Sequence, residues 1–348
     1  MATGGRRDDA ALLEGLDRWV AAHPERVCGF QAPGSDEAPT RVTALEHAGG
    51  GMANETVLVD LGPSSPGMVV RLPPLEPTFP DYELGPQAIV QNAVAAAGVP
   101  APAPAVVEHD PTWVGAPFLV MPRVRGDVPG PAPFLDPYVR EAGPVLQRLM
   151  HDGLIDALAD VHAVRWRGTV LEDQLPGVSL RDAVDRWAAY VAWSSEGDPL
   201  PALAEALEWC TRYRPAEREA VVLWGDVRLG NLVFDRERRV RAVLDWDLAS
   251  LGPPEMDLGW HLGLEFMMEA LFGGRVPGFP GTLEVIERYE RRSGHQVTDL
   301  AWHEVFALVR ALAINDRHQR ITGDARRREN PMGNILLARL EAASGMEG

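Results

Sequence analysis

The stretch from Val221 to Asp257 constrains this chain more than any other, because it places polar side chains at fixed intervals between apolar runs. Residues 221–223 form an apolar run that stops at Trp224 and Gly225, so Asp226 falls where a buried segment becomes a loop. A single Asp in such a loop usually caps a helix or carries a solvated charge. Its meaning therefore depends on the residues that follow it.

Two β-prone runs follow, residues 232–234 and 240–244, and a charged turn separates them. This pattern predicts a hairpin, which would fold Asp245 back towards Asn231. A carboxylate that can accept a proton from a hydroxyl would then lie near an amide carbonyl and a second carboxylate. Oxygen ligands of this kind suit Mg²⁺, and the whole set indicates phosphoryl transfer.

The motifs in this stretch resemble those of a known family. WGDVRLGN resembles the catalytic loop of the aminoglycoside phosphotransferases, which are relatives of the protein kinases, and LDWDLASLGPPEMD resembles their metal-binding segment. The resemblance implies that Asp226 is the catalytic base and that Asn231 and Asp245 are Mg²⁺ ligands. It also implies that Asp257 braces the loop. Trp224 stands where the family usually has His, which bears on the geometry of the loop more than on its chemistry.

The same resemblance implies an α+β, two-lobe, protein-kinase-like fold, and a chain of 348 residues is long enough for it. Residues 1–124 would form a small, β-rich nucleotide-binding lobe with a helix, ending in a hinge. Residues 125–348 would form a large, mainly helical lobe for catalysis and acceptor binding. Helices expected at 180–193 and 200–213 would help to form the acceptor site.

Strands expected at 42–47 and 55–61 flank a glycine turn, and a third strand is expected at 68–72. By resemblance the turn would lay backbone amides over the nucleotide phosphates. Arg71 on the third strand stands where this fold has a Lys that pairs with phosphate; a guanidinium can bind phosphate in two places at once. The turn residues are Gly49, Gly50, Gly51, Met52 and Ala53.

Two further nucleotide contacts follow from the resemblance. Glu83 is preferred as the acidic partner of Arg71, because Gln87 stands where a Glu is expected. Met121 would lie at the back of the base pocket, with the carbonyl of Pro122 and the amide of Val124 facing the purine edge. Proline has no N–H, so it fits only as the acceptor there.

Composition limits the partners. The net charge of −17 argues against binding to nucleic acid or to anionic membranes; it would suit a cationic substrate, or it only keeps the protein soluble. No stretch resembles a membrane span or a signal peptide, which predicts a cytoplasmic protein. Cys28 and Cys210 fit no disulfide or metal spacing, and the histidines show no ligand spacing either.

The sequence therefore predicts an enzyme that moves the γ-phosphate of ATP or GTP, with Mg²⁺, to a hydroxyl of a small molecule, acting as a monomer or homodimer. The first expectation for the acceptor is an antibiotic, either an aminoglycoside or another hydroxylated natural product. A metabolic acceptor, such as a choline-like amine or a hydroxy acid, is the alternative within the same class. A nucleotide-binding pseudokinase is the alternative from another class.

Overall fold

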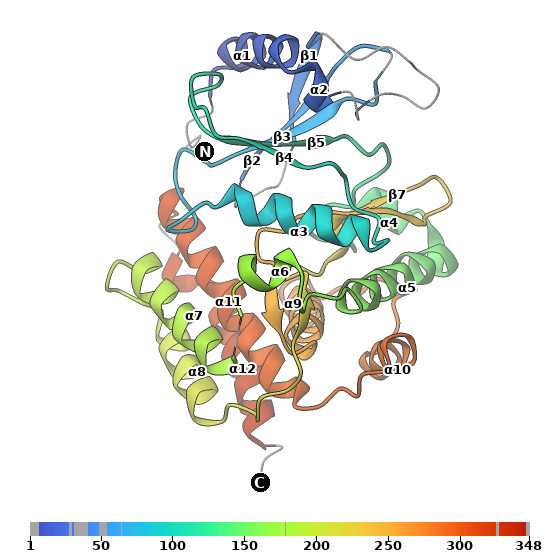
Figure 1. Cartoon of the computed structure of the whole chain (residues 1–348). Coiled ribbons are helices and arrows are strands. Elements are labelled where there is room, and N and C mark those ends of the chain that lie inside the picture. The colour runs from blue at the N-terminus through green and yellow to red at the C-terminus, as the bar shows by residue number, and fades with distance from the viewer. Residues whose placement is uncertain are drawn as a thin grey trace. The chain divides into compact units, whose positions relative to one another are not determined.

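A computed structural model describes residues 7–27, 30, 41–48, 54–63, 65–177, 179–324 and 327–345 (Figure 1). The chain divides into two compact units, Met1–Gly126 and Asp127–Gly348. The first unit is rich in strands and the second is mainly helical, so the expected kinase-like α+β fold is confirmed. No helix of the described ranges combines the length and apolar character that crossing a bilayer would require.

The first unit is built on an antiparallel sheet with the strand order β1-β2-β3-β5-β4. Its strands are β1 (Ala44–His47), β2 (Glu55–Asp60), β3 (Met68–Leu72), β4 (Val106–Glu108) and β5 (Phe118–Pro122). Its helices are α1 (Asp9–Ala22), α2 (Pro24–Val27) and α3 (Leu84–Ala96). Helix α1 ends before α2 begins, because Pro24 lacks an N–H and disfavours a helical residue before it.

Helices cover both faces of this sheet (Figure 1). Successive side chains of a strand point to opposite faces. On β5, Phe118 accordingly packs in one core with Trp19 of α1. Leu119 and Met121 belong to a second core with Leu84 of α3. The sheet is therefore buried between α1 and α3.

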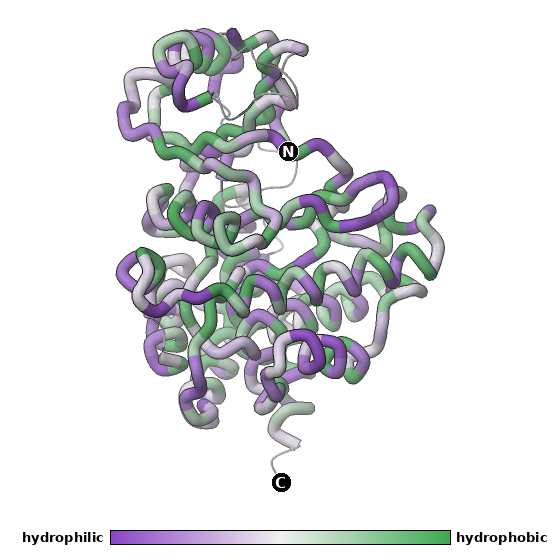
Figure 2. Tube along the Cα trace, turned by 45° about the vertical axis from the view of Figure 1, so that its right-hand side comes forward, coloured by the Kyte–Doolittle hydropathy of each residue, from purple (hydrophilic) through white to green (hydrophobic). Residues whose placement is uncertain are grey.

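The second unit contains nine α-helices among its described residues, with short strands between them. Its helices are α4 (Pro137–Arg140), α5 (Gly143–His162), α6 (Val170–Gln174), α7 (Leu180–Ser194), α8 (Pro201–Arg212), α9 (Glu255–Phe272), α10 (Thr282–Ser293), α11 (Leu300–Ile321) and α12 (Pro331–Gly345). Apolar and polar stretches alternate along its helices (Figure 2), as expected for helices that each bury one face.

Helices α9 and α11 approach each other closely in this unit. A Cβ atom built on Gly259 of α9 would lie 2.6 Å from the carbonyl carbon of His303 on α11. Only glycine allows the two helices to come so near at this position. Their contact forms the centre of the second unit and fixes the start of α9, which lies beside the candidate site.

Two strand pairs shape the segment that the sequence singled out. The first pair joins β6 (Val221–Leu223) to β9 (Ser250–Gly252), and the second is the expected hairpin of β7 (Leu232–Phe234) and β8 (Val240–Val243). A single 3₁₀ turn, η2 (Leu229–Asn231), precedes the hairpin. The β6–β9 pair holds together the ends of a segment that contains the hairpin.

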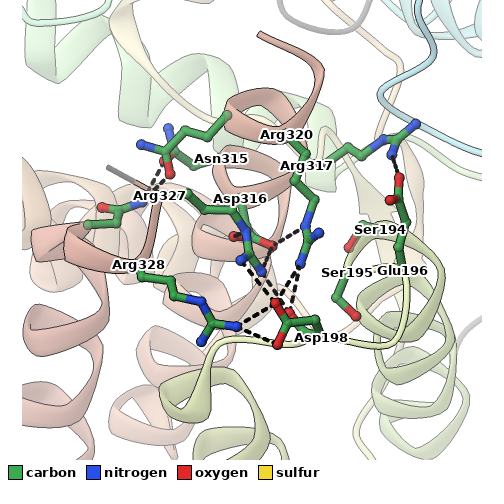
Figure 3. A network of polar contacts seen from close by, with 12 residues as sticks. Ser194, Ser195, Glu196, Asp198, Asn315, Asp316, Arg317, Arg320, Arg327 and Arg328 are labelled. Atoms are coloured by element: carbon green, nitrogen blue, oxygen red, sulfur yellow. Dashed lines mark hydrogen bonds and ion pairs between the residues drawn. The ribbon is translucent and has the colours of Figure 1, made fainter. Parts of the chain in front are cut away.

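The turn between α7 and α8 is fastened to α11 and to the 3₁₀ turn η3 (Arg327–Glu329) by a polar network (Figure 3). The carbonyl of Asp198 accepts 2.7 Å hydrogen bonds from Arg320 and from Arg327. Its carboxylate pairs with Arg328 at 2.6 Å. Both Arg320 and Arg327 also pair with Asp316, which is only 1% exposed. The network anchors helices α7 and α8 at the turn that joins them.

Candidate active site

Asp226 lies in a tight loop directly after β6. The preceding Gly225 has φ of +90°, and a Cβ atom there would lie 2.2 Å from the carbonyl oxygen of Leu248. The turn therefore needs glycine. The side chain of Asp226 remains 17% exposed. A carboxylate in this position is held by the loop and still reachable from solvent.

Both carboxylate oxygens of Asp226 are hydrogen-bonded. Trp260 on α9 donates its indole N–H to Oδ1 at 2.8 Å. Asn231 donates its side-chain amide to Oδ2 at 2.7 Å and to the backbone carbonyl of Asp226 at 2.9 Å. These bonds fix the orientation of the carboxylate, as a general base requires.

Asp245 is brought to the same place by the hairpin. Leu244 donates its backbone N–H to the carbonyl of Asn231 at 2.8 Å, and Asp245 is the next residue along the chain. Asp245 has φ of +63°, a left-handed conformation that costs a non-glycine residue about 1–3 kcal/mol. Such strain concentrates at functional sites. A carboxylate and an amide carbonyl are hard oxygen donors, and this donor set fits Mg²⁺.

Asp257 holds the loop from below. It is fully buried in the first turn of α9 and accepts hydrogen bonds from the backbone N–H groups of Trp224 and Gly225, at 2.7 Å and 2.9 Å. His162 lies 3.1 Å from the same carboxylate. This is the bracing role that the sequence predicted for Asp257, and it comes from the start of a helix rather than from a loop.

Trp224 is also part of this framework. Its ring is buried, and its indole N–H contacts the carbonyls of Leu244 and Asp245, at 2.8 Å and 3.2 Å. The side chain therefore links the loop that carries Asp226 to the segment that carries Asp245. A large indole in this position provides a direct tie between the two polar segments.

Arg228 is a residue that the sequence analysis missed. Its Nε lies 2.9 Å from Oδ2 of Asp226. Burial alone would lower the pKa of Arg228, but the carboxylates of Asp226 and Asp245 outweigh that effect and raise it. The guanidinium is thus fully charged beside both carboxylates. The signal that could have identified Arg228 in the sequence is its position two residues after Asp226.

Arg310 of α11 and Trp260 were missed as well. The Arg310 guanidinium lies over the Trp260 ring at 4.5 Å and over the Trp187 ring of α7 at 5.2 Å. Burial lowers the pKa of Arg310 to about 10, although Asp257 and Asp226 oppose the change. These residues come from separate helices, so no local sequence pattern connects them to Asp226.

The predicted nucleotide contacts lie in the first unit. Arg71 is buried on β3 and pairs in register with Leu119 of β5, while Met121 follows on the same strand. Glu83 is exposed at the N-cap of α3, and Gln87 is buried one turn later. Pro122 ends β5, and Val124 follows it. The expected phosphate turn, Gly49 to Ala53, lies outside the described residues.

Comparisons with known proteins agree on a phosphotransferase scaffold. A family profile described as "Phosphotransferase enzyme family" matches residues 44–306. A solved Ralstonia eutropha structure, provisionally named an aminoglycoside phosphotransferase, is 23% identical with a TM-score of 0.67, covering 97% of this chain and 99% of that one. A thermostable form of aminoglycoside phosphotransferase APH(4)-Ia, bound to ADP and hygromycin B, is 15% identical with a TM-score of 0.58. That match covers 87% of this chain and 95% of that one. At these identities the solved structures show the fold alone.

A curated relative gives a different name. The chain is 29% identical over 260 residues to acyl-CoA dehydrogenase family member 11 of Gallus gallus. This match covers 72% of the chain but 32% of the relative. The chain thus spans about a third of the length of that protein.

Proposed function

Because the chain belongs to the phosphotransferase enzyme family, we propose that it transfers the γ-phosphate of ATP or GTP, with Mg²⁺, to a hydroxyl of a small molecule. The observation that carries this proposal is the fixed carboxylate of Asp226. Asn231 and Trp260 donate hydrogen bonds to it, and Asp257 accepts a hydrogen bond from the backbone of the same loop. We further propose that the enzyme acts in the cytoplasm as a monomer or homodimer.

Asp226 would orient the acceptor hydroxyl and take its proton. Asn231 and Asp245 would hold Mg²⁺, which neutralises phosphate charge when bound. Arg228, charged and next to Asp226, is placed to contact the transferred phosphoryl group, since a guanidinium binds phosphate oxygens in pairs. Residues of the first unit, Arg71 with Glu83 and the Gly49 to Ala53 turn, would bind the donor phosphates.

For the acceptor we favour a hydroxy acid or its thioester over an aminoglycoside. The ionisable side chains that approach Asp226 include two arginines, Arg228 and Arg310, and Arg186 of α7 is near enough to lower the pKa of Arg310 further. Carboxylates balance these arginines, but the Arg228 side chain is 31% exposed and could pair with an acceptor carboxylate, which an aminoglycoside lacks. The curated relative is also named for acyl-CoA dehydrogenation, a chemistry of carboxylic acid derivatives.

The test is transfer of labelled γ-phosphate from ATP and from GTP, with Mg²⁺, to a panel of hydroxy acids, hydroxyacyl thioesters, aminoglycosides and choline. Wild type is compared with Asp226→Asn and with Asp173→Asn, a control at an exposed position of α6. A general base contributes roughly 10²- to 10⁴-fold, so Asp226→Asn should lose nearly all transfer while Asp173→Asn keeps it.

The outcomes separate the candidate functions. Labelling of a hydroxy acid supports the favoured acceptor, and labelling of an aminoglycoside replaces it with the antibiotic. Mg²⁺-nucleotide binding without transfer to any acceptor would support a pseudokinase and overturn the proposal. Transfer that survives in Asp226→Asn would overturn the role of Asp226 as the base.

A further inference from the structure

Three side chains that the proposed reaction does not use come together beneath the catalytic loop. They are His151 of α5 and two residues of α9, His261 and Glu265. The two Nε2 atoms lie 3.1 Å apart. Oε1 of Glu265 lies 3.3 Å from Nε2 of His151 and 3.9 Å from Nε2 of His261. The two histidines show no ligand spacing in the sequence, because His151 comes from another helix than His261.

Two of these three separations are close to those between neighbouring ligands of a tetrahedral metal ion, and the third is longer. Bonds of about 2.0–2.1 Å from zinc to nitrogen or oxygen place tetrahedral ligand atoms about 3.3–3.4 Å apart. The three measured separations lie on either side of that value. A small movement of Glu265 towards His261 would complete one face of the tetrahedron.

The hydrogen bonds of His261 orient its ring for a ligand role. One ring nitrogen is hydrogen-bonded to the backbone of Val227, and the other, Nε2, faces His151. A backbone carbonyl that holds the far N–H of an imidazole fixes the tautomer and leaves Nε2 free to bind metal.

Glu265 supplies the negative charge of the group. Its Oε1 atom is buried and has no hydrogen-bond partner of good geometry among the described residues, although both imidazoles are near. A cation between the three atoms would satisfy it. The Glu265 side chain is 28% exposed, whereas both imidazoles are buried. The ring of Phe279 packs against His151, with ring centroids 4.8 Å apart.

We propose that Nε2 of His151, Nε2 of His261 and Oε1 of Glu265 bind one divalent first-row transition ion, with Zn²⁺ the best fit, and that a water completes the tetrahedron. No fourth His, Cys, Asp or Glu joins the group within the part of the chain that the structure describes. Imidazole nitrogens are poor Mg²⁺ ligands, so this site differs in chemistry from the Asn231 and Asp245 pair.

The proposed ion would have a structural role. His261 contacts the backbone of Val227, the residue directly after Asp226. An ion that joins α5 to α9 through His151 and His261 would therefore hold this part of the catalytic loop in place. The proposal does not depend on the identity of the acceptor or on phosphoryl transfer.

The experiment measures metal in the full-length protein without nucleotide or Mg²⁺. Purified wild type should retain one zinc per chain by elemental analysis. After chelation, Co²⁺ should restore a single site with the strong visible absorption of tetrahedral cobalt, and metal removal should lower Tm. Glu265→Gln should bind Co²⁺ at least about tenfold more weakly.

Two variants serve as controls. Glu269→Gln changes an exposed carboxylate one turn further along α9, and Asp245→Asn changes the proposed Mg²⁺ site; both should keep the tetrahedral cobalt spectrum. A wild type that retains no metal and shows no tetrahedral spectrum overturns the proposal, as does a Glu265→Gln protein that binds like wild type. If Glu265→Gln does not fold, X-ray absorption of cobalt-loaded wild type decides, since it must show two imidazole ligands.

Discussion

At the scale of single residues, the catalytic carboxylate owes its orientation to side chains that do not themselves react. Trp260 holds one oxygen of Asp226, and Arg310 stacks on the ring of Trp260. Arg310 also lies 3.3 Å from the carbonyl of Gly225, through Nη2. These contacts connect α9 and α11 to one proton-accepting group.

Trp260→Phe keeps an aromatic ring in place but removes the indole N–H that bonds Asp226, together with the five-membered part of the indole. A hydrogen bond to a charged group is worth about 1.5–3 kcal/mol, so kcat should fall by roughly 10- to 100-fold while the KM for nucleotide stays unchanged. Steady-state kinetics measure both constants. Trp302→Phe is the matched control, because its indole bonds the carbonyl of Cys210 instead. An equal fall in kcat for both variants would contradict this role of Trp260.

His303 should make stability depend on pH. Burial, with a smaller contribution from Arg218, lowers its pKa to about 3 from the ordinary 6.5. Between these two values the unfolded chain binds a proton that the folded chain does not. This residue therefore stabilises the fold fully above pH 6.5, and its contribution falls by about 1.4 kcal/mol for each pH unit below that.

Urea unfolding of wild type and His303→Gln at pH 7, 6 and 5 measures this effect. The variant cannot take up the proton, so the stability advantage of wild type should shrink as the pH falls. A constant difference across the three pH values would show that His303 titrates normally in the folded protein.

At the scale of elements, strand pairs that rest on apolar runs could be predicted from sequence, and contacts between helices could not. The β7–β8 hairpin follows from two apolar runs around a charged turn, and it was predicted. The β6–β9 pair was missed, because Ser250–Gly252 is a three-residue strand without an apolar run. The contacts of Trp260 and Arg310 depend on which faces of α9 and α11 meet, and spacing within one helix does not determine that.

The polar network at the turn between α7 and α8 provides a test at this scale (Figure 3). Asp316→Asn leaves Arg320 and Arg327 beside a neutral partner in a buried position, which should cost about 3–5 kcal/mol. Asp198→Asn should cost much less, because its carboxylate is exposed and its backbone carbonyl still accepts from both arginines. Chemical denaturation measures the loss of folding stability in each variant. Equal losses would contradict the view that the buried Asp316 carboxylate matters more to the fold than the exposed Asp198 carboxylate.

At the scale of the whole molecule, charge is distributed unevenly. The chain carries a net charge of −17, yet Arg228 and Arg310 lie among the carboxylates near Asp226. Composition alone favoured solubility over a cationic substrate as the reason for the acidic excess. Only the folded arrangement reveals that arginines gather with the carboxylates at the candidate site.

Binding of Mg²⁺-nucleotide should stabilise the whole protein. At about 100 times Kd a ligand adds about 2.7 kcal/mol, which raises Tm. Asp245→Ala should abolish the part of this rise that requires Mg²⁺, because it removes one of the two proposed ligands. Thermal melts with ATP or GTP, with and without Mg²⁺, report the effect, and Asp173→Asn is the control. A Mg²⁺-dependent rise that persists in Asp245→Ala would remove that residue from the metal site.

The pairing of Val221 with Gly252 closes the segment that carries Asp226, Asn231 and Asp245 into a ring held at its base. The turn around Glu237 lies at the far end of the hairpin, where the chain is exposed. Doubling the length of a flexible loop costs only about 0.6 kcal/mol. Extra residues after Glu237 would therefore lengthen the tip and leave the base undisturbed, so this turn is where the chain can gain length, or accept a fused peptide, without moving its reactive groups.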